Sequence, residues 1–345
     1  MKLELNAIEQ QTLIKHRKMK ITRFALLLMM GVLFAATTQL HAQHYPAGSA
    51  GIKAGSLPSP GFTFEDDNAF YYAPRMKGFS GLYLNYSFEE FKYVQAPRLM
   101  WITDWKILGA NYGMAARVPI IDQKITGLFS TAPFIGPSHQ EKNRSGLSDV
   151  QIEPLLLSWH LMRFDFSAGY SLWIPTSNPD FKNRYFFDNL SQGYWTHSIA
   201  LGATWYLDER KTWAVSLLNH YDINTPQYST WVTVPVSPAH PFGADLEDTT
   251  LGDIYTLEWA ISKTIKNVDV GLTGYYQQQV TDTQGPTPNG PTYQSERIHV
   301  AGIGPEVGIT LPKWGVSASL RYAYEFSAMD HPQGNLINLT IKKSF

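Results

Sequence analysis

Apolar and polar residues alternate with a period of two over many stretches of about 10 to 13 residues. In residues 164–174 one face carries Phe164, Phe166, Ala168, Tyr170, Leu172 and Ile174, and the other carries Asp165, Ser167, Gly169 and Ser171. The pattern recurs in residues 213–223, 255–261, 314–326 and 336–345. Successive side chains of a strand point to opposite faces, so the pattern predicts strands with one apolar and one polar face.

The connections between these strands alternate between short and long without exception. Strands that run from the short turns to the long loops are expected to start near residues 62, 109, 164, 212, 268 and 314. Strands that run back are expected to start near residues 98, 148, 195, 252, 299 and 336. The long connections are residues 73–97, 121–147, 175–194, 225–251, 281–298 and 327–335. Short turns at one end and long loops at the other are typical of outer-membrane barrels. We therefore predict an all-β fold, a transmembrane up-and-down antiparallel β-barrel of about 12 strands. We interpret residues 79–88 as the upper part of the first hairpin, above the membrane. Counting them as a further spanning strand would require another one, near residues 125–135, and would raise the number to fourteen.

The last strand, residues 336–345, ends the chain on an aromatic residue. Its apolar stripe consists of Ile337, Leu339, Ile341 and Phe345. An unpaired edge strand is a liability, and a closed barrel removes it by pairing the last strand with the first. The stripe also resembles the C-terminal signal by which the barrel assembly machinery of the outer membrane recognises its clients. We expect that machinery and the lipid of the outer membrane as partners.

The N-terminal region has the features of a secretory signal. Lys20 and Arg23 precede an apolar run over residues 24–36, and Ala42 could be the last residue before cleavage. The run is short for a spanning helix, which needs about 20 residues, although an N-terminal anchor is the alternative. We divide the chain into an N-terminal extension with signal peptide (1–42), a Gly/Pro-rich periplasmic or lumen segment (43–61) and the barrel (62–345).

Composition excludes several classes of function. The chain of 345 residues has no Cys, which excludes disulfide scaffolds and thiolate chemistry, and its net charge of −1 gives no indication of nucleic-acid binding. The ten His residues show no metal-ligand spacing, so we expect neither a metal nor another cofactor. His197 and Ser198 point to opposite faces of a strand and cannot form a catalytic pair, so we expect no enzyme.

The polar faces of the strands must point into the barrel because the apolar faces meet lipid. The residues predicted to line the lumen are Arg117, Asp149, Gln151, Glu153, Asp165, His220, Asp222, Glu258, Asp269, Gln277, Glu306, Arg321 and Glu325. Acidic groups outnumber arginines in this set. The charges could form an ion-pair network that holds the barrel, or line a pathway and set its selectivity; the two interpretations are compatible.

Several segments resemble the outer-membrane transporter family of the meta-pathway of phenol degradation. They are residues 44–62, 102–113, 147–160, 193–225, 269–281, 302–308 and 313–326. The resemblance implies the outer membrane of a Gram-negative bacterium and uptake of aromatic or hydrophobic small molecules. It offers no catalytic motif.

These observations predict a channel for passive uptake of small solutes, aromatic or hydrophobic ones included. One alternative is a closed structural or adhesive barrel, plugged by charged side chains or by residues 43–61. The other is a hydrolase, which needs a nucleophile within reach of a histidine.

Overall fold

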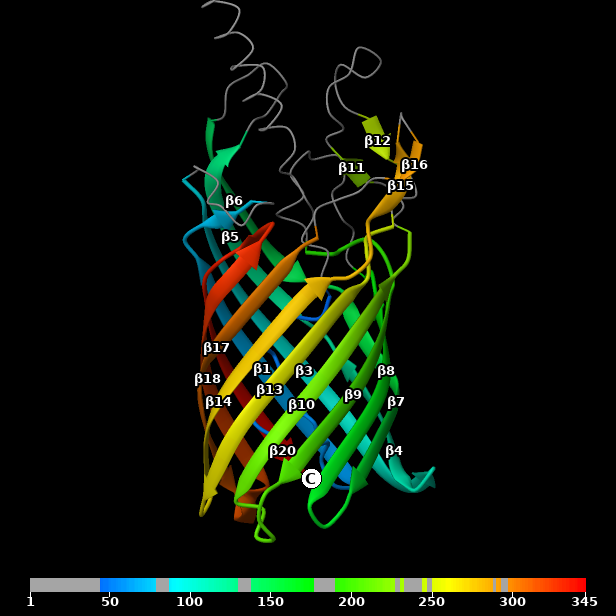
Figure 1. The fold of residues 1–345 in the computed structure, drawn as a ribbon, viewed down its shortest axis with the longest axis vertical. Helices are drawn as coiled ribbons and strands as arrows, with labels where there is room; N and C mark the ends of the chain where they lie inside the picture. Colours follow the sequence, from blue (N-terminus) through cyan, green and yellow to red (C-terminus); the bar gives the residue numbers. More distant parts are fainter. Residues whose placement is uncertain are drawn as a thin grey trace, which may run out of the picture.

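In the computed structural model the residues described are 44–78, 87–129, 138–176, 190–226, 230–232, 244–246, 250–287, 290–292 and 297–345. Within these residues, twelve antiparallel strands close into a barrel (Figure 1). In ring order they are β1 (Gly61–Ala73), β20 (Asn335–Ser344), β18 (Val316–Met329), β17 (His299–Leu311), β14 (Val268–Gln279), β13 (Ile254–Ile265), β10 (Trp213–Asn224), β9 (Thr196–Tyr206), β8 (Phe164–Ile174), β7 (Val150–His160), β4 (Ala110–Arg117) and β3 (Glu89–Ile107). The predicted fold and its twelve strands are confirmed.

The ring closes through the two ends of the barrel sequence. β20 pairs with β1 from Thr63 opposite Ser344 to Tyr72 opposite Asn335, and β3 covers the other side of β1. The amide of Phe345 donates to the carbonyl of Phe62 at 2.9 Å. Closure leaves no open edge, which a sheet in lipid cannot tolerate because no water is present to bond its backbone.

The two ends of the barrel differ. At the end that carries the C-terminus, hereafter the turn end, connections of two to six residues join successive strands (Figure 1). One contains a 3-10 turn, Pro312–Trp314. The opposite, loop end carries the small pairs β2 (Met76–Lys77) with β19 (His331–Pro332), β11 (Thr230–Val232) with β12 (Ala244–Leu246), and β15 (Gln284–Thr287) with β16 (Gly290–Thr292). In outer-membrane barrels the short turns face the periplasm.

Two segments expected in loops are strands instead. Glu89–Gln95 extend β3 beyond β4 and pair with β1 on one side and with β5 (Ile120–Phe129) on the other. β5 and β6 (Ser138–Leu147) form a hairpin that continues β4 and β7 past Pro119. The expectation of loops over residues 73–97 and 121–147 is wrong here because strands beyond the bilayer need no apolar face. Of the segment 79–88, residues 79–86 lie outside the described residues.

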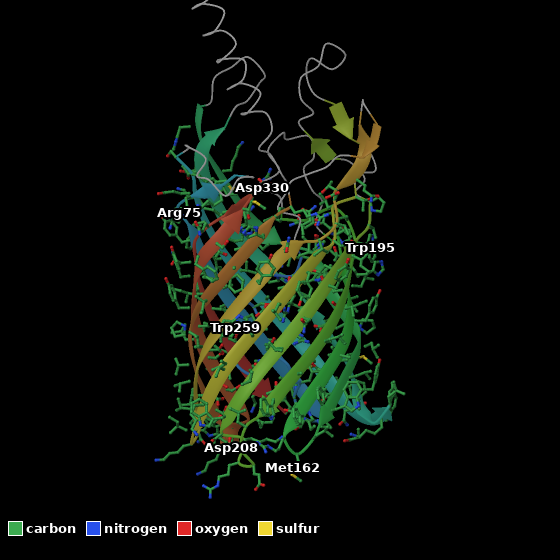
Figure 2. All side chains as sticks on the ribbon, viewed as in Figure 1. Arg75, Met162, Trp195, Asp208, Trp259 and Asp330 are labelled. Atoms are coloured by element: carbon green, nitrogen blue, oxygen red, sulfur yellow. The ribbon has the colours of Figure 1, made fainter. Side chains whose placement is uncertain are left out.

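The outer surface carries aromatic residues near both ends of the strands. At the turn end the exposed rings are Phe62, Phe64, Trp101, Phe164, Trp205, Trp213, Trp314 and Phe345. Towards the loop end they are Phe70, Tyr72, Phe91, Trp195, Tyr324 and Phe326. Figure 2 shows Trp195 at the loop end, Trp259 midway along the wall, and Met162 and Asp208 at the turn end. Two such girdles around an aliphatic band match the interfaces of a bilayer.

Among the described residues, no helix is long and apolar enough to cross a membrane.

The turn between β9 and β10 is held by one carboxylate. Asp208 accepts the backbone amides of Thr212 and Trp213 at 2.9 and 2.8 Å. The Trp213 amide, followed by the amide and hydroxyl of Thr212, lowers the pKa of Asp208, because these donors favour the charged carboxylate. A lowered folded-state pKa stabilises the fold above the unfolded pKa, and that contribution is lost as pH falls through the folded pKa.

We therefore expect Asp208→Asn to reduce the free energy of unfolding near neutral pH. The difference from wild type should shrink as the pH falls below about 5, where a free Asp begins to protonate. Urea unfolding followed by tryptophan fluorescence at a series of pH values measures this. A difference that stays the same down to pH values of about 2, well below the pKa of a free Asp, would contradict the assignment.

Candidate functional site: the barrel interior

Residues 44–60, hereafter the lumen segment, run through the inside of the barrel before β1 begins at Gly61. At the loop end, the His44 ring contacts Asp149 and Thr196 at 2.8 and 2.7 Å. Near the turn end, Ser56 donates at 2.9 Å to Asp165, the second residue of β8. The segment therefore passes from one end of the barrel to the other. Turns within it are closed by backbone bonds such as Ala54 N–H to the Gly51 carbonyl.

The wall presents a carboxylate to the lumen segment at several levels. The Tyr45 hydroxyl donates to Glu258 at 2.8 Å, and the Ile52 amide donates to Glu306 at 3.0 Å. The Lys53 ammonium lies 3.1 Å from an Asp269 oxygen. Together with Asp149 and Asp165, five carboxylates hold the segment.

A single guanidinium complements these carboxylates. Arg321 donates to the carbonyl of Gly48 at 2.6 Å, to that of Ser49 at 3.1 Å, and to that of Ala50. It also pairs with Glu306 at 3.3 Å. Backbone groups buried away from water need such partners, and the wall supplies them in place of a sheet or helix.

Glycines allow the segment to lie directly on the wall. A Cβ on Gly55 would come within 2.3 Å of the Ala203 carbonyl oxygen, and one on Gly202 within 2.8 Å of the Gly55 Cα. The glycine at position 202 thus leaves room both for the lumen segment and for the Ser167 side chain of the neighbouring strand β8. Near the turn end, Leu57 packs on the inward apolar cluster of Met100, Ile102, Ala115 and Leu156.

The opposite wall, formed by β1, β3, β4, β7 and β20, carries a cluster of paired charges. Its members, hereafter the charge cluster, are the buried Glu65, Asp67, Arg117 and Glu153, the partly buried Arg98 and the exposed Lys342. Arg98 binds Glu153 through two bonds of 2.7 Å, Arg117 lies 3.2 Å from both Glu65 and Asp67, and Lys342 lies 2.7 Å from Glu65. Three cations and three carboxylates balance, and mutual pairing offsets the cost of removing them from bulk water.

A cavity of about 300 Å³ lies between the lumen segment and the charge cluster. Its lining includes His220, whose ring stacks on Tyr45 with centroids 3.8 Å apart. Neither ring nitrogen of His220, nor Nε of Arg117, has a partner within the described residues. Ligand sites for small molecules commonly begin at this volume.

Twelve of the thirteen residues predicted to line the lumen are buried, and Asp269 is partly exposed. Those that contact the lumen segment are Asp149, Asp165, His220, Glu258, Asp269, Gln277, Glu306 and Arg321. Arg117 and Glu153 belong to the charge cluster. The remaining three bond elsewhere on the wall: Gln151 to Ser171, Asp222 to Ser198, and Glu325 to Tyr71 and Tyr275.

The residues of the predicted assembly signal lie on the outside. Ile337, Ile341 and Phe345 are exposed on the outer face of β20, and Leu339 is partly buried. His197 contacts the Tyr170 hydroxyl, whereas its neighbour Ser198 is buried and donates to Asp222.

The predicted set of lumen residues includes only Arg117 and Glu153 of the charge cluster and lacks Glu65, Asp67, Arg98 and Lys342. The alternation of Phe62 and Phe64 with Thr63 and Glu65 in β1 is a usable signal for inward carboxylates. Arg98 directly follows a segment expected to be a loop. The alternation of apolar and polar residues therefore does not show whether its side chain points inward or outward.

We predict that Gly55→Ala displaces the lumen segment, because the added methyl group would collide with the backbone of Ala203. Gly308→Ala is the matched control, since its Cβ would meet nothing closer than 3.5 Å. The chain has no Cys, so a Ser56→Cys reporter can be labelled with a membrane-impermeant maleimide in each background. Labelling should rise several-fold with Gly55→Ala and stay unchanged with Gly308→Ala. Equal labelling in both would show that the segment does not depend on this close approach.

Comparison with known proteins agrees with the barrel. An outer-membrane channel from Pseudomonas putida F1 superposes with a TM-score of 0.63 at 13% identity, covering 88% of this chain and 100% of that one. The translocator domain of the autotransporter NalP from Neisseria meningitidis gives a TM-score of 0.43 at 12% identity, covering 94% and 98%. At these identities the similarity to the channel shows the fold, that of a Gram-negative outer-membrane barrel. No curated protein sequence matches significantly. Residues 92–341, well over half of the chain, match the family described as the MetA-pathway of phenol degradation, and the chain belongs to that family.

Proposed function

We propose that the protein is a passive outer-membrane channel for small solutes, and that the lumen segment is a plug that must move for the channel to open. The observation that carries the proposal is the nature of the contacts between segment and wall. They are mostly hydrogen bonds and ion pairs, such as those of Ser56 and Lys53, which water can replace one by one. A permanent core element would instead bury a continuous apolar face.

The size of the interior supports small solutes. The cavity of about 300 Å³ beside the lumen segment lies at the lower limit of pockets that hold small molecules. Twelve-stranded barrels fall between side-chain-filled eight-stranded barrels and wide porins. The family description supports aromatic compounds among the solutes, and no enzymatic step enters the proposal.

A closed structural barrel is the second candidate. The charge cluster favours it, because paired charges on one wall could serve only to hold the barrel shape. The two candidates differ in the conductance expected once the lumen segment is removed: a channel opens, whereas a structural barrel stays closed.

Deletion of residues 44–58 should raise the single-channel conductance in planar bilayers several-fold over wild type. Heat-modifiable migration in gels establishes that the deletion variant is a folded barrel. A folded deletion variant that conducts no better than wild type would contradict the channel and favour the structural barrel.

We also propose that the outer-membrane assembly machinery recognises β20 through its outward stripe and final ring. The exposed Phe345 side chain ends the strand beside Phe62. Deletion of Phe345 should lower the amount of barrel in the outer membrane several-fold. The conductance of the molecules that do insert should be unchanged. Normal surface levels would refute the assignment.

A further inference from the structure

The charges inside the barrel are distributed unevenly between the two walls. The charge cluster is formally neutral. The rest of the inner wall carries seven carboxylates on its spanning strands or directly before one of them: Asp149, Asp165, Asp222, Glu258, Asp269, Glu306 and Glu325. Within the described part of this wall, only Arg321 stands among them as a guanidinium, and Lys211 reaches Asp165 from the turn end at 3.6 Å. The lumen segment covers most of these carboxylates.

The lumen segment offers donors to the carboxylates and acceptors to the guanidinium. It brings an ammonium group to Asp269 and carbonyls to Arg321. When the segment leaves, the acidic wall loses these partners and the pore carries a large excess of negative charge. Such a pore concentrates cations and repels anions.

The contacts of His44 identify the place on this wall whose chemistry suits an organic cation. The Asn224 amide donates to the Gly252 carbonyl at 3.0 Å, which directs the Asn224 oxygen towards the Thr196 hydroxyl. That hydroxyl donates to Asn224 at 2.7 Å, so it has no proton left for His44. His44 Nδ1 lies 2.7 Å from this hydroxyl, and Nε2 lies 2.8 Å from an oxygen of Asp149. The ring of the lumen segment therefore lies against a wall carboxylate, the group with which an organic cation would pair.

Aromatic rings complete the surroundings of this His44 ring. Trp173 stacks on it with centroids 5.4 Å apart, and Tyr194 meets it edge-on at 5.0 Å. Burial raises the pKa of Tyr194, so its ring remains neutral beside Asp149. The second oxygen of Asp149 is buried and has no partner in the described residues. Aromatic faces around a group that pairs with a carboxylate are features of sites that hold organic cations.

We propose that the open pore selects small organic cations, and that Asp149, Trp173 and Tyr194 form their binding subsite, which His44 occupies while the lumen segment is in place. The proposal rests on the proposed channel and names the solute class that it passes. An ammonium or amidinium group would take the place of the His44 ring at Asp149, with an apolar body against Trp173. Anions of the same size would meet unpaired carboxylates along the acidic wall.

The experiment uses the variant lacking residues 44–58 in planar bilayers. Reversal potentials are measured first in a gradient of KCl. They are then measured in a gradient of benzylammonium chloride and in a gradient of potassium benzoate. We expect several-fold preference for potassium over chloride and for benzylammonium over benzoate. A variant that conducts with no preference, or with a preference for anions, would overturn the inference but leave the channel intact. A folded variant that conducts nothing would overturn the channel itself.

Substitutions locate the subsite. In the same background, Asp149→Asn and Trp173→Leu should each reduce the preference for benzylammonium over potassium several-fold. Glu209→Gln, in the exposed turn between β9 and β10, is the control and should change nothing. If the Asp149 and Trp173 variants behave like the control, the subsite is wrong even if the pore is cation-selective. If Asp149→Asn fails to fold, Trp173→Leu still tests the subsite.

Discussion

The interior of a bilayer holds no water, so every backbone amide and carbonyl there must find a hydrogen-bond partner in the protein. The rest of this structure depends on that constraint. The sheet must close, and it does so by pairing β20 with both β1 and β18 along their length. Closure directs every second side chain inward, away from lipid, and those inward side chains are mostly polar. The barrel therefore encloses a polar interior that must be hydrated or filled.

The lumen segment fills that interior by imitating the hydrogen bonds of water. Its backbone amides and carbonyls bond to wall carboxylates and to Arg321, and its few side chains do the same, as with Tyr45 and Glu258. Glycine at positions 55 and 202 allows the contact to be close. This arrangement is specific enough to fix a path for the segment. The wall groups that make these contacts are polar, so water can hydrate them once the segment has left. The same contacts are therefore consistent with a plug that moves.

The strands could be predicted from the sequence because lipid imposes a simple rule on each of them. Every second residue of Phe164–Ile174 or of Val316–Met329 faces a bilayer, so the alternation is strong. Inward carboxylates such as Glu306 are predicted by the same alternation. Strand residues beyond the bilayer do not face lipid, so the alternation of apolar and polar residues is lost there. The hairpin of β5 and β6 lacks this alternation because its outward positions are polar, as at Asp122 and Lys124.

The pairing inside the barrel could not be predicted from the sequence. The contact of His44 with Asp149 spans 105 residues, and that of Arg321 with Gly48 spans 273. The Gly/Pro-rich composition of the lumen segment fits a periplasmic lead-in equally well. One wall is neutral and the other acidic because Arg98 and Arg117 lie beside carboxylates on the same wall. Only the three-dimensional structure gives these positions.

The central claim is that the lumen segment blocks the channel and must move for solutes to pass. A double substitution, Ser56→Cys with Asp165→Cys, would replace the 2.9 Å hydrogen bond between these residues by a disulfide in a chain that has no other cysteine. The most direct measurement is the conductance of this variant in planar bilayers before and after addition of a reductant. The account predicts a closed channel when oxidised and channel openings when reduced. Equal conductance in both states, with the disulfide verified by mass spectrometry, would contradict it.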